Sequence, residues 1–178
     1  MEYYTTDGFK YDLLDKDANK ILVKKLVKFD LKISTAESFT GGLISKLITD
    51  VPGASGIFDC GVCTYSNDAK IKILGIDKDI LKRYGPVSLE TSKMMAFGVH
   101  KLSGADLAIS STGYAGSEKE KKYNENVGLI FIGVFFKNKI YTVKLDFKKY
   151  NKLKHFSRNY VRKQSSKHAL SLAIKLID

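Results

Sequence analysis

Extended apolar segments alternate with segments of helical periodicity along most of the chain, and this order constrains the fold more than any other feature. Residue patterns typical of strands occupy the ranges 31–36, 57–65, 106–112, 127–136 and 140–147. Apolar residues at helical spacing occupy the ranges 14–26, 41–49, 66–74, 77–83, 88–102 and 151–177. The last two predicted strands flank Lys137-Asn138-Lys139, which indicates a hairpin turn.

This order predicts an α/β fold, a three-layer α/β/α sandwich with a mixed, mostly parallel sheet of about five strands. At 178 residues we expect a single domain over 1–178. In such sheets, ligands bind beyond the carboxyl ends of the parallel strands, where the chain turns into helices. Three segments rich in hydroxyls, amides and small residues are expected there: STAESFTGG at 34–42, TYSNDAK at 64–70 and STGYAG at 111–116.

The charge and the apolar runs limit the possible partners. The net charge of +11 favours anions such as phosphate esters or nucleic acid. Much of the excess is scattered lysine, so a solvated basic surface is the simpler interpretation. No apolar run approaches the length of about 18 residues that a membrane span needs, and residues 1–20 lack the apolar centre of a signal peptide. We therefore expect no membrane association and a cytoplasmic location.

Cys60 and Cys63 form a C-x-x-C pattern, which occurs both in redox pairs and in zinc sites. The pair lies in a predicted strand, where an odd offset directs the two side chains to opposite faces. The sequence has no second Cys/His pair at ligand spacing. We therefore expect two structural thiols and no metal site.

The segment 34–42 places the glycine pair Gly41-Gly42 at the start of a predicted helix. Glycine lets backbone amides approach a ligand closely, and a helix start favours an anion or a developing oxyanion. The simpler interpretation is a helix cap, in which Ser38 or Thr40 accepts a hydrogen bond from an amide. The nucleotide-binding patterns G-x-G-x-x-G and G-x-x-x-x-G-K-[ST] are absent from the sequence.

A serine nucleophile at position 38 would need a base. A Ser-His-Asp triad is not expected, because no histidine lies in a strand-end loop near Ser38. All the histidines lie in predicted helices: His100, His155 and His168. Lys70 is the other candidate, since a partly desolvated lysine loses its proton more readily than a free one. It follows the second strand-end loop, with Tyr65 as a possible hydrogen-bonding partner. The alternative is that Lys70 is one of many solvated surface lysines.

Six segments, in this order and with similar spacing, resemble the CinA C-terminal domain family. They are TAESFTGG, DVPGAS at 50–55, GVCTYSNDAKIKILGI at 61–76, YGPVS at 84–88, ADLAISSTGYAG at 105–116 and NVGLIFIGV at 126–134. The resemblance extends over about residues 14–177. Characterised members of this family are nicotinamide mononucleotide deamidases with a three-layer α/β/α fold.

The resemblance implies a role for each matching residue. Ser38 of the A-E-S-x-T-G-G motif is the implied nucleophile, Lys70 of T-Y-S-N-x-x-K is the implied base, and Tyr65 is a helper at this dyad. Substrate would be bound by residues of all three loops and of the C-terminal R-x-x-V-R-x-Q pattern: Thr40, Gly41, Gly42, Asn67, Thr112, Gly113 and Arg158, with Arg162 as a second phosphate ligand.

The implied reaction converts nicotinamide mononucleotide to nicotinic acid mononucleotide and ammonia through an acyl-enzyme. It needs neither a metal nor an organic cofactor, and with a small-molecule substrate we expect no nucleic acid partner. The resemblance also implies a homo-oligomer. Many members carry a large N-terminal domain that this sequence lacks, so we expect the stand-alone form.

The chain departs from the family pattern at two places near the implied substrate. Residues 117–126 are charged, where many members have a glycine- and proline-rich loop, and Phe156-Ser157 replaces a common Gly-Asp. With the basic charge, these changes support a second hypothesis. The chain would then be a catalytically inactive nucleotide- or nucleic-acid-binding domain of the same fold, whose binding of nucleic acid would weaken steeply with salt.

Overall fold

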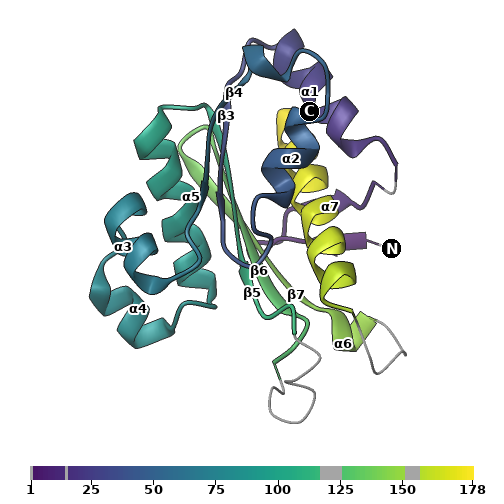
Figure 1. The fold of residues 1–178 in the computed structure, drawn as a ribbon. Coiled ribbons are helices and arrows are strands. Elements are labelled where there is room, and N and C mark those ends of the chain that lie inside the picture. The colour runs from purple at the N-terminus through teal and green to yellow at the C-terminus, as the bar shows by residue number, and fades with distance from the viewer. Residues whose placement is uncertain (1, 15, 117–125, 151–156) are drawn as a thin grey trace.

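The centre of the molecule is a five-stranded sheet with the strand order β4-β3-β5-β6-β7 (Figure 1). The computed structural model describes residues 2–14, 16–116, 126–150 and 157–178. The sheet strands are β3 (Ile33–Glu37), β4 (Phe58–Cys63), β5 (Leu107–Gly113), β6 (Leu129–Phe136) and β7 (Lys139–Asp146). Strand β3 pairs in parallel with β4 and β5, and β6 runs antiparallel to both β5 and β7. The mixed sheet that the sequence predicts is confirmed.

Helices lie on both sides of this sheet, which confirms the three-layer prediction (Figure 1). Helices α1, α2 and α7 cover one face over the larger apolar cluster, and α5 covers the other face with α3 and α4 packed outside it. The helices are α1 (Ala18–Lys28), α2 (Leu43–Thr49), α3 (Asn67–Leu74), α4 (Lys78–Tyr84), α5 (Leu89–Ser103), α6 (Phe147–Tyr150), α7 (Arg158–Ile177) and the 3₁₀ turn η1 (Ala54–Gly56). None of the helices in the described ranges is long and apolar enough to cross a membrane.

The central strands carry hydroxyl side chains although they are buried. Thr35 Oγ1 of β3 lies 2.7 Å from Ser45 Oγ of α2, within hydrogen-bond distance. On the opposite face, Ser110 Oγ of β5 donates to the carbonyl of Ser92 in α5 at 2.6 Å. These bonds tie a helix of each layer to the sheet, because a buried hydroxyl without a partner is costly.

A two-stranded antiparallel ribbon, β1 (Glu2–Tyr4) and β2 (Lys10–Asp12), precedes the first helix and was not predicted. It packs on α7, where the buried Tyr11 hydroxyl lies 3.0 Å from His168 Nδ1. Burial lowers the pKa of His168 to about 4. Strands of three residues are too short to show an alternating pattern, so their pairing depends on this tertiary contact.

The structure also moves the starts of two predicted helices. α1 begins at Ala18 instead of residue 14. α7 begins at Arg158 instead of residue 151, because the Ser157 hydroxyl accepts a hydrogen bond from the first turn and caps the helix there. Residues 151–156, which the prediction included in this helix, lie outside the described residues.

Gly98 sets the close approach of α3, which carries Lys70, to α5. A Cβ atom at position 98 would lie 2.9 Å from Leu74 Cβ and would also press on the Leu74 backbone. Neither group can move without shifting the end of α3. The glycine is therefore needed for space rather than for backbone conformation.

We expect Gly98→Ala to lower the free energy of unfolding by about 1–3 kcal/mol, because overpacking outweighs the better helix propensity of alanine. Urea unfolding followed by circular dichroism measures the change. Gly56→Ala is the matched control, since no atom lies within 4 Å of its Cβ position. An unchanged or raised stability of Gly98→Ala would show that α3 can move aside at no cost.

Candidate active site

The parallel strands β3, β4 and β5 bring the three polar segments of the sequence to one edge of the sheet. Glu37, the last residue of β3, is in register with Cys63 of β4 and Ser111 of β5. The ladder continues one step further, because Thr64 N–H donates to Glu37 O at 2.8 Å and Ser38 N–H donates to Ser111 O at 3.0 Å. Ser38 therefore emerges between the ends of its two neighbouring strands.

Lys70 reaches this point from the first helical turns of α3. Ser66 caps α3 by accepting a hydrogen bond from Ala69 N–H, and the helix directs Lys70 back towards the strand ends. Lys70 Nζ lies 3.2 Å from Ser38 Oγ, 2.8 Å from Thr64 O and 3.3 Å from Tyr65 O. Lys70 is 1% exposed and Ser38 is 8% exposed. Lys70 is therefore not one of the solvated surface lysines, which was the alternative interpretation of the sequence.

Burial makes the neutral form of Lys70 easier to reach. Desolvation lowers the pKa of Lys70 from 10.5 to about 8. Within the described part of the chain, no carboxylate forms an ion pair with its ammonium group. The ammonium form can donate to all three oxygens, while the neutral amine can donate to the two carbonyls and accept from the Ser38 hydroxyl through its lone pair. In its neutral form, Lys70 is therefore placed to take the Ser38 proton.

The described histidines lie elsewhere. His100 Nδ1 lies 2.8 Å from Ala105 O and its ring stacks on Phe135. His168 is buried against the N-terminal ribbon. His155, which the sequence places in a helix, lies outside the described residues. The only described base in hydrogen-bond contact with Ser38 Oγ is Lys70.

Glu37 occupies the start of α2. Its buried carboxylate accepts hydrogen bonds from Ile44 N–H at 3.0 Å, Ser45 N–H at 2.8 Å and Ser45 Oγ at 2.7 Å. The helix start is thus neutralised by a side chain of the chain itself. Among the described residues, neither the expected cap by Ser38 or Thr40 nor an open anion cradle is found there. The Glu37 carboxylate, which was not predicted, takes their place.

The turn between β3 and α2 leaves several backbone amides for a ligand. Gly41 N–H donates to Ser38 O at 3.1 Å, and Ser38 N–H is already bonded to Ser111 O. In the described ranges no acceptor is bonded to the amides of Phe39, Thr40 and Gly42. These amides, rather than that of Gly41, are available to a negatively charged oxygen near Ser38.

Tyr65 and Arg158 meet at the exposed side of the site. Tyr65 is 63% exposed, and its phenol oxygen accepts a hydrogen bond from Arg158 Nη2 at 2.9 Å. Arg158 Nη1 donates to Gly116 O at 3.1 Å. Tyr65 therefore contacts Lys70 through its backbone carbonyl, while its side chain pairs with Arg158. Arg162, one turn further along α7, donates to Thr40 O.

Three other residues expected at the substrate differ in what they can offer. The buried Thr112 hydroxyl donates to Pro86 O at 2.7 Å, so its proton is already engaged. Gly113 gives room to Ile130 of β6, whose side chain would lie 2.6 Å from a Cβ there. Asn67 is exposed in the first turn of α3, and its side chain is accessible to a ligand.

Thr64 is a further residue that sequence reasoning missed. Its hydroxyl is buried and has no hydrogen-bond partner among the described residues, beside the carbonyl that holds Lys70. A buried hydroxyl without a partner is uncommon and costly. Its position in the sequence could have indicated it. Thr64 lies at the end of a predicted strand, beside the predicted loop, and so at the same edge of the sheet as Ser38.

The cysteines of β4 do not form a second centre. Residue burial alternates along the strand, so Cys60 is half-buried on one side and Cys63 is exposed on the other. Burial raises the pKa of both thiols, which makes them weak nucleophiles and ligands. Nowhere in the described ranges do three or more metal-ligating side chains gather.

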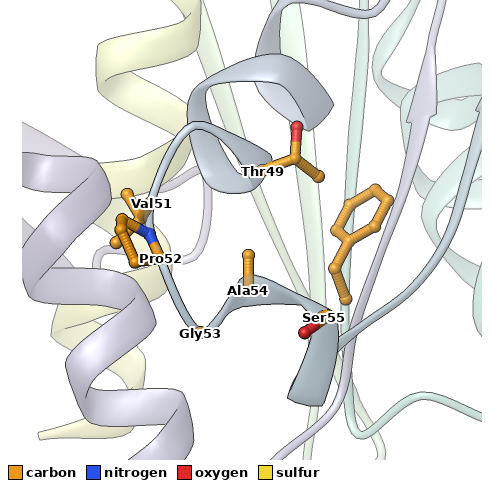
Figure 2. Close-up of a pocket in the computed structure, with 7 residues that line it drawn as sticks. Thr49, Val51, Pro52, Gly53, Ala54 and Ser55 are labelled. Atoms are coloured by element: carbon orange, nitrogen blue, oxygen red, sulfur yellow. The ribbon is translucent and has the colours of Figure 1, made fainter.

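A separate hollow of about 340 Å³ lies at the other end of the sheet (Figure 2). It is formed where α2 ends, around η1 and at the start of β4, by Thr49, Val51, Pro52, Gly53, Ala54, Ser55 and Phe58. No titratable side chain lines it. It therefore offers none of the groups that the strand-end site contains.

Comparison with known proteins identifies relatives over most of the chain. The model of the CinA C-terminal domain matches residues 15–177. A competence-damage inducible protein of Caldicellulosiruptor saccharolyticus is 42% identical over 167 residues, which are 94% of this chain and 39% of that protein. A CinA-like protein of Akkermansia muciniphila is 54% identical over 97 residues, 54% of this chain and 23% of that protein. The chain thus spans about two fifths or less of these relatives.

Solved structures share the fold. The competence/damage inducible protein CihA of Agrobacterium tumefaciens is 30% identical, with a TM-score of 0.79 over 94% of this chain and 99% of that one. A CinA superfamily protein of Klebsiella pneumoniae is 25% identical, with a TM-score of 0.80 over 90% of this chain and 96% of that one.

We expect Glu37→Gln to lower the free energy of unfolding by roughly 1.5–3 kcal/mol, because an amide cannot accept all three hydrogen bonds and places N–H groups against N–H groups. Thermal and urea unfolding of the purified variant measure this. Asp59→Asn, an exposed carboxylate on β4, is the control and should change stability by less than about 0.5 kcal/mol. Equal effects of the two substitutions would contradict a capping role for Glu37.

Proposed function

Because this chain belongs to the CinA C-terminal domain family, we propose that it is an amidohydrolase that converts nicotinamide mononucleotide to nicotinic acid mononucleotide and ammonia. The observation that carries the proposal is the buried contact of Lys70 Nζ with Ser38 Oγ at 3.2 Å. The names of the relatives describe competence-damage induction and state no reaction. The activity is therefore inferred from the dyad and from the family resemblance.

In the proposed first step, neutral Lys70 takes the hydroxyl proton of Ser38 while Ser38 Oγ attacks the carboxamide carbon of the pyridinium ring. The carbonyl oxygen becomes an oxyanion, which the amides of Phe39, Thr40 and Gly42 can stabilise. Lys70 then returns the proton to the amide nitrogen, the C–N bond breaks and ammonia leaves. This leaves an ester between Ser38 and the nicotinoyl group.

In the second step, water attacks the ester carbon and Lys70 accepts its proton. The C–O bond to Ser38 breaks, Ser38 Oγ regains a proton from Lys70, and the carboxylic acid product loses its own proton to solvent. The scheme uses side chains, backbone amides and water. Lys70 is neutral at the start of both steps, which is the state that its burial favours.

The guanidinium of Arg158 at the exposed side of the site supports the choice of a phosphorylated substrate. Arg158 and the exposed Tyr65 form a pair there, beside the strand-end loops. A guanidinium is suited to a phosphate because it presents several N–H donors in one plane. We propose that the substrate phosphate takes the Arg158 donors that Tyr65 and Gly116 now occupy.

Ammonia release from nicotinamide mononucleotide, without added metal, tests the function. We expect Ser38→Ala and Lys70→Ala to reduce kcat by roughly 10³-fold or more, since the nucleophile and the base act as a unit. Lys72→Ala is the matched control, because Lys72 is exposed on the same helix. Binding of the nucleotide by wild-type protein without any turnover would instead favour the inactive binding domain.

The pH dependence of kcat/KM gives a second test. Lys70 must be neutral to act as a base, and its pKa is about 8. We therefore expect kcat/KM to rise about tenfold per pH unit below pH 8 and to level off above it. Initial rates from pH 6 to 10 measure this, with unfolding monitored at each pH. A profile that is flat between pH 6 and 8 would contradict the assignment of Lys70 as the base.

A further inference from the structure

We propose that Arg162 is a positioning residue that holds the nucleophile turn, Ser38–Gly42, in its reactive shape. The proposal rests on the amidohydrolase function given above, because it assigns a role in that reaction. It replaces the sequence expectation that Arg162 binds the substrate phosphate together with Arg158. The residue acts through Thr40 and does not itself touch the reacting atoms.

Two N–H groups of the Arg162 guanidinium donate to one carbonyl oxygen, that of Thr40. Arg162 Nη2 lies 2.6 Å and Nε lies 3.2 Å from the carbonyl oxygen of Thr40. Leu43 N–H donates to the same oxygen at 3.3 Å. The guanidinium also lies against Gly41, since Nη2 would be 3.5 Å from a Cβ at that position. Arg162 is half-buried, so solvent competes weakly for these bonds.

The peptide between Thr40 and Gly41 is thereby fixed at both ends. Its oxygen accepts the Arg162 fork, and its N–H donates to Ser38 O at 3.1 Å. Because a peptide unit is planar, fixing the oxygen also fixes the direction of this N–H. Through this peptide, Arg162 on α7 restrains the backbone carbonyl of Ser38, although the two residues are 124 positions apart in the sequence.

The turn needs such a restraint. Gly41 and Gly42 have positive φ angles of 59° and 86°, so the segment contains two residues with wide backbone freedom. Ser38 Oγ must remain within reach of Lys70 Nζ, and the amides of Phe39 and Thr40 must keep their direction for the oxyanion. Glu37 holds one end of the turn through α2, and Arg162 holds its middle.

The alternative role makes a different demand on the same side chain. A phosphate ligand would need guanidinium donors that a substrate can reach. Arg158 has two nitrogens engaged, with Tyr65 and with Gly116 O, and both of these bonds are exposed. The two bonds from Arg162 to Thr40 O are instead part-buried, so a phosphate has less access to them. A lysine at this position could donate from only one nitrogen and could not form the planar fork.

Steady-state ammonia release from nicotinamide mononucleotide by Arg162→Ala and Arg162→Lys tests the proposal. We expect kcat to fall on the order of 10²-fold in both variants with KM within about threefold of wild type. Added methylguanidine should restore part of the kcat that Arg162→Ala loses. Lys163→Ala, a substitution of the exposed neighbour, is the control, and its kcat should equal that of the wild type with or without methylguanidine. A rise in KM with unchanged kcat would overturn the proposal in favour of phosphate binding.

Hydrogen exchange of the Gly41 amide, measured by NMR on the full chain, provides a readout that does not depend on activity. We expect exchange about tenfold faster in Arg162→Lys, which keeps the charge and the helix, and unchanged in Lys163→Ala. Unchanged exchange in Arg162→Lys would overturn the restraint. If the wild type releases no ammonia, the proposed function fails, and the exchange result alone decides whether Arg162 holds the turn.

Discussion

The site depends on one desolvated amine. Lys70 is almost fully buried, and its nitrogen is surrounded by the hydroxyl of Ser38 and the carbonyls of Thr64 and Tyr65. A charged ammonium in this place loses the hydration that it has in water, which lowers its pKa to about 8. The free energy of unfolding therefore rises with pH between about 8 and the pKa of 10.5 that Lys70 has in the unfolded chain. Below pH 8 the folded protein must hold a buried charge at Lys70. The same cost is what would let Lys70 act as the proposed base.

The rest of the fold keeps the partners of that amine in place. Parallel pairing of β3 with β4 and β5 puts Ser38 next to the carbonyl of Thr64, and Gly98 permits the close packing of α5 on the end of α3, the helix that carries Lys70. The turn after Ser38 is held from two sides, by the Glu37 carboxylate at the start of α2 and by Arg162 from α7. Elements from both helical layers thus converge on one short turn.

Much of this arrangement could be predicted from the sequence. The periodicity predicted the mixed sheet and its two helical layers, and Asn138 marked the hairpin turn, where it has a φ of 60°. The motifs singled out Ser38 and Lys70, which the structure brings together. Prediction failed where the partner is distant in the chain. The packing of the N-terminal ribbon on α7 and the bond from Thr112 to Pro86 have no local signature.

The sequence by itself determined the types of element, their order and the residues able to carry the chemistry, because periodicity and turn chemistry are local properties. Only the tertiary structure decided which of those residues act on one another. It turned Glu37 into the cap of α2, gave the Tyr65 phenol to Arg158, and bound Arg162 to Thr40 instead of leaving it for a phosphate. The physical reason is that a hydrogen bond and a desolvated charge depend on which groups meet in three dimensions, and spacing along the chain does not specify that.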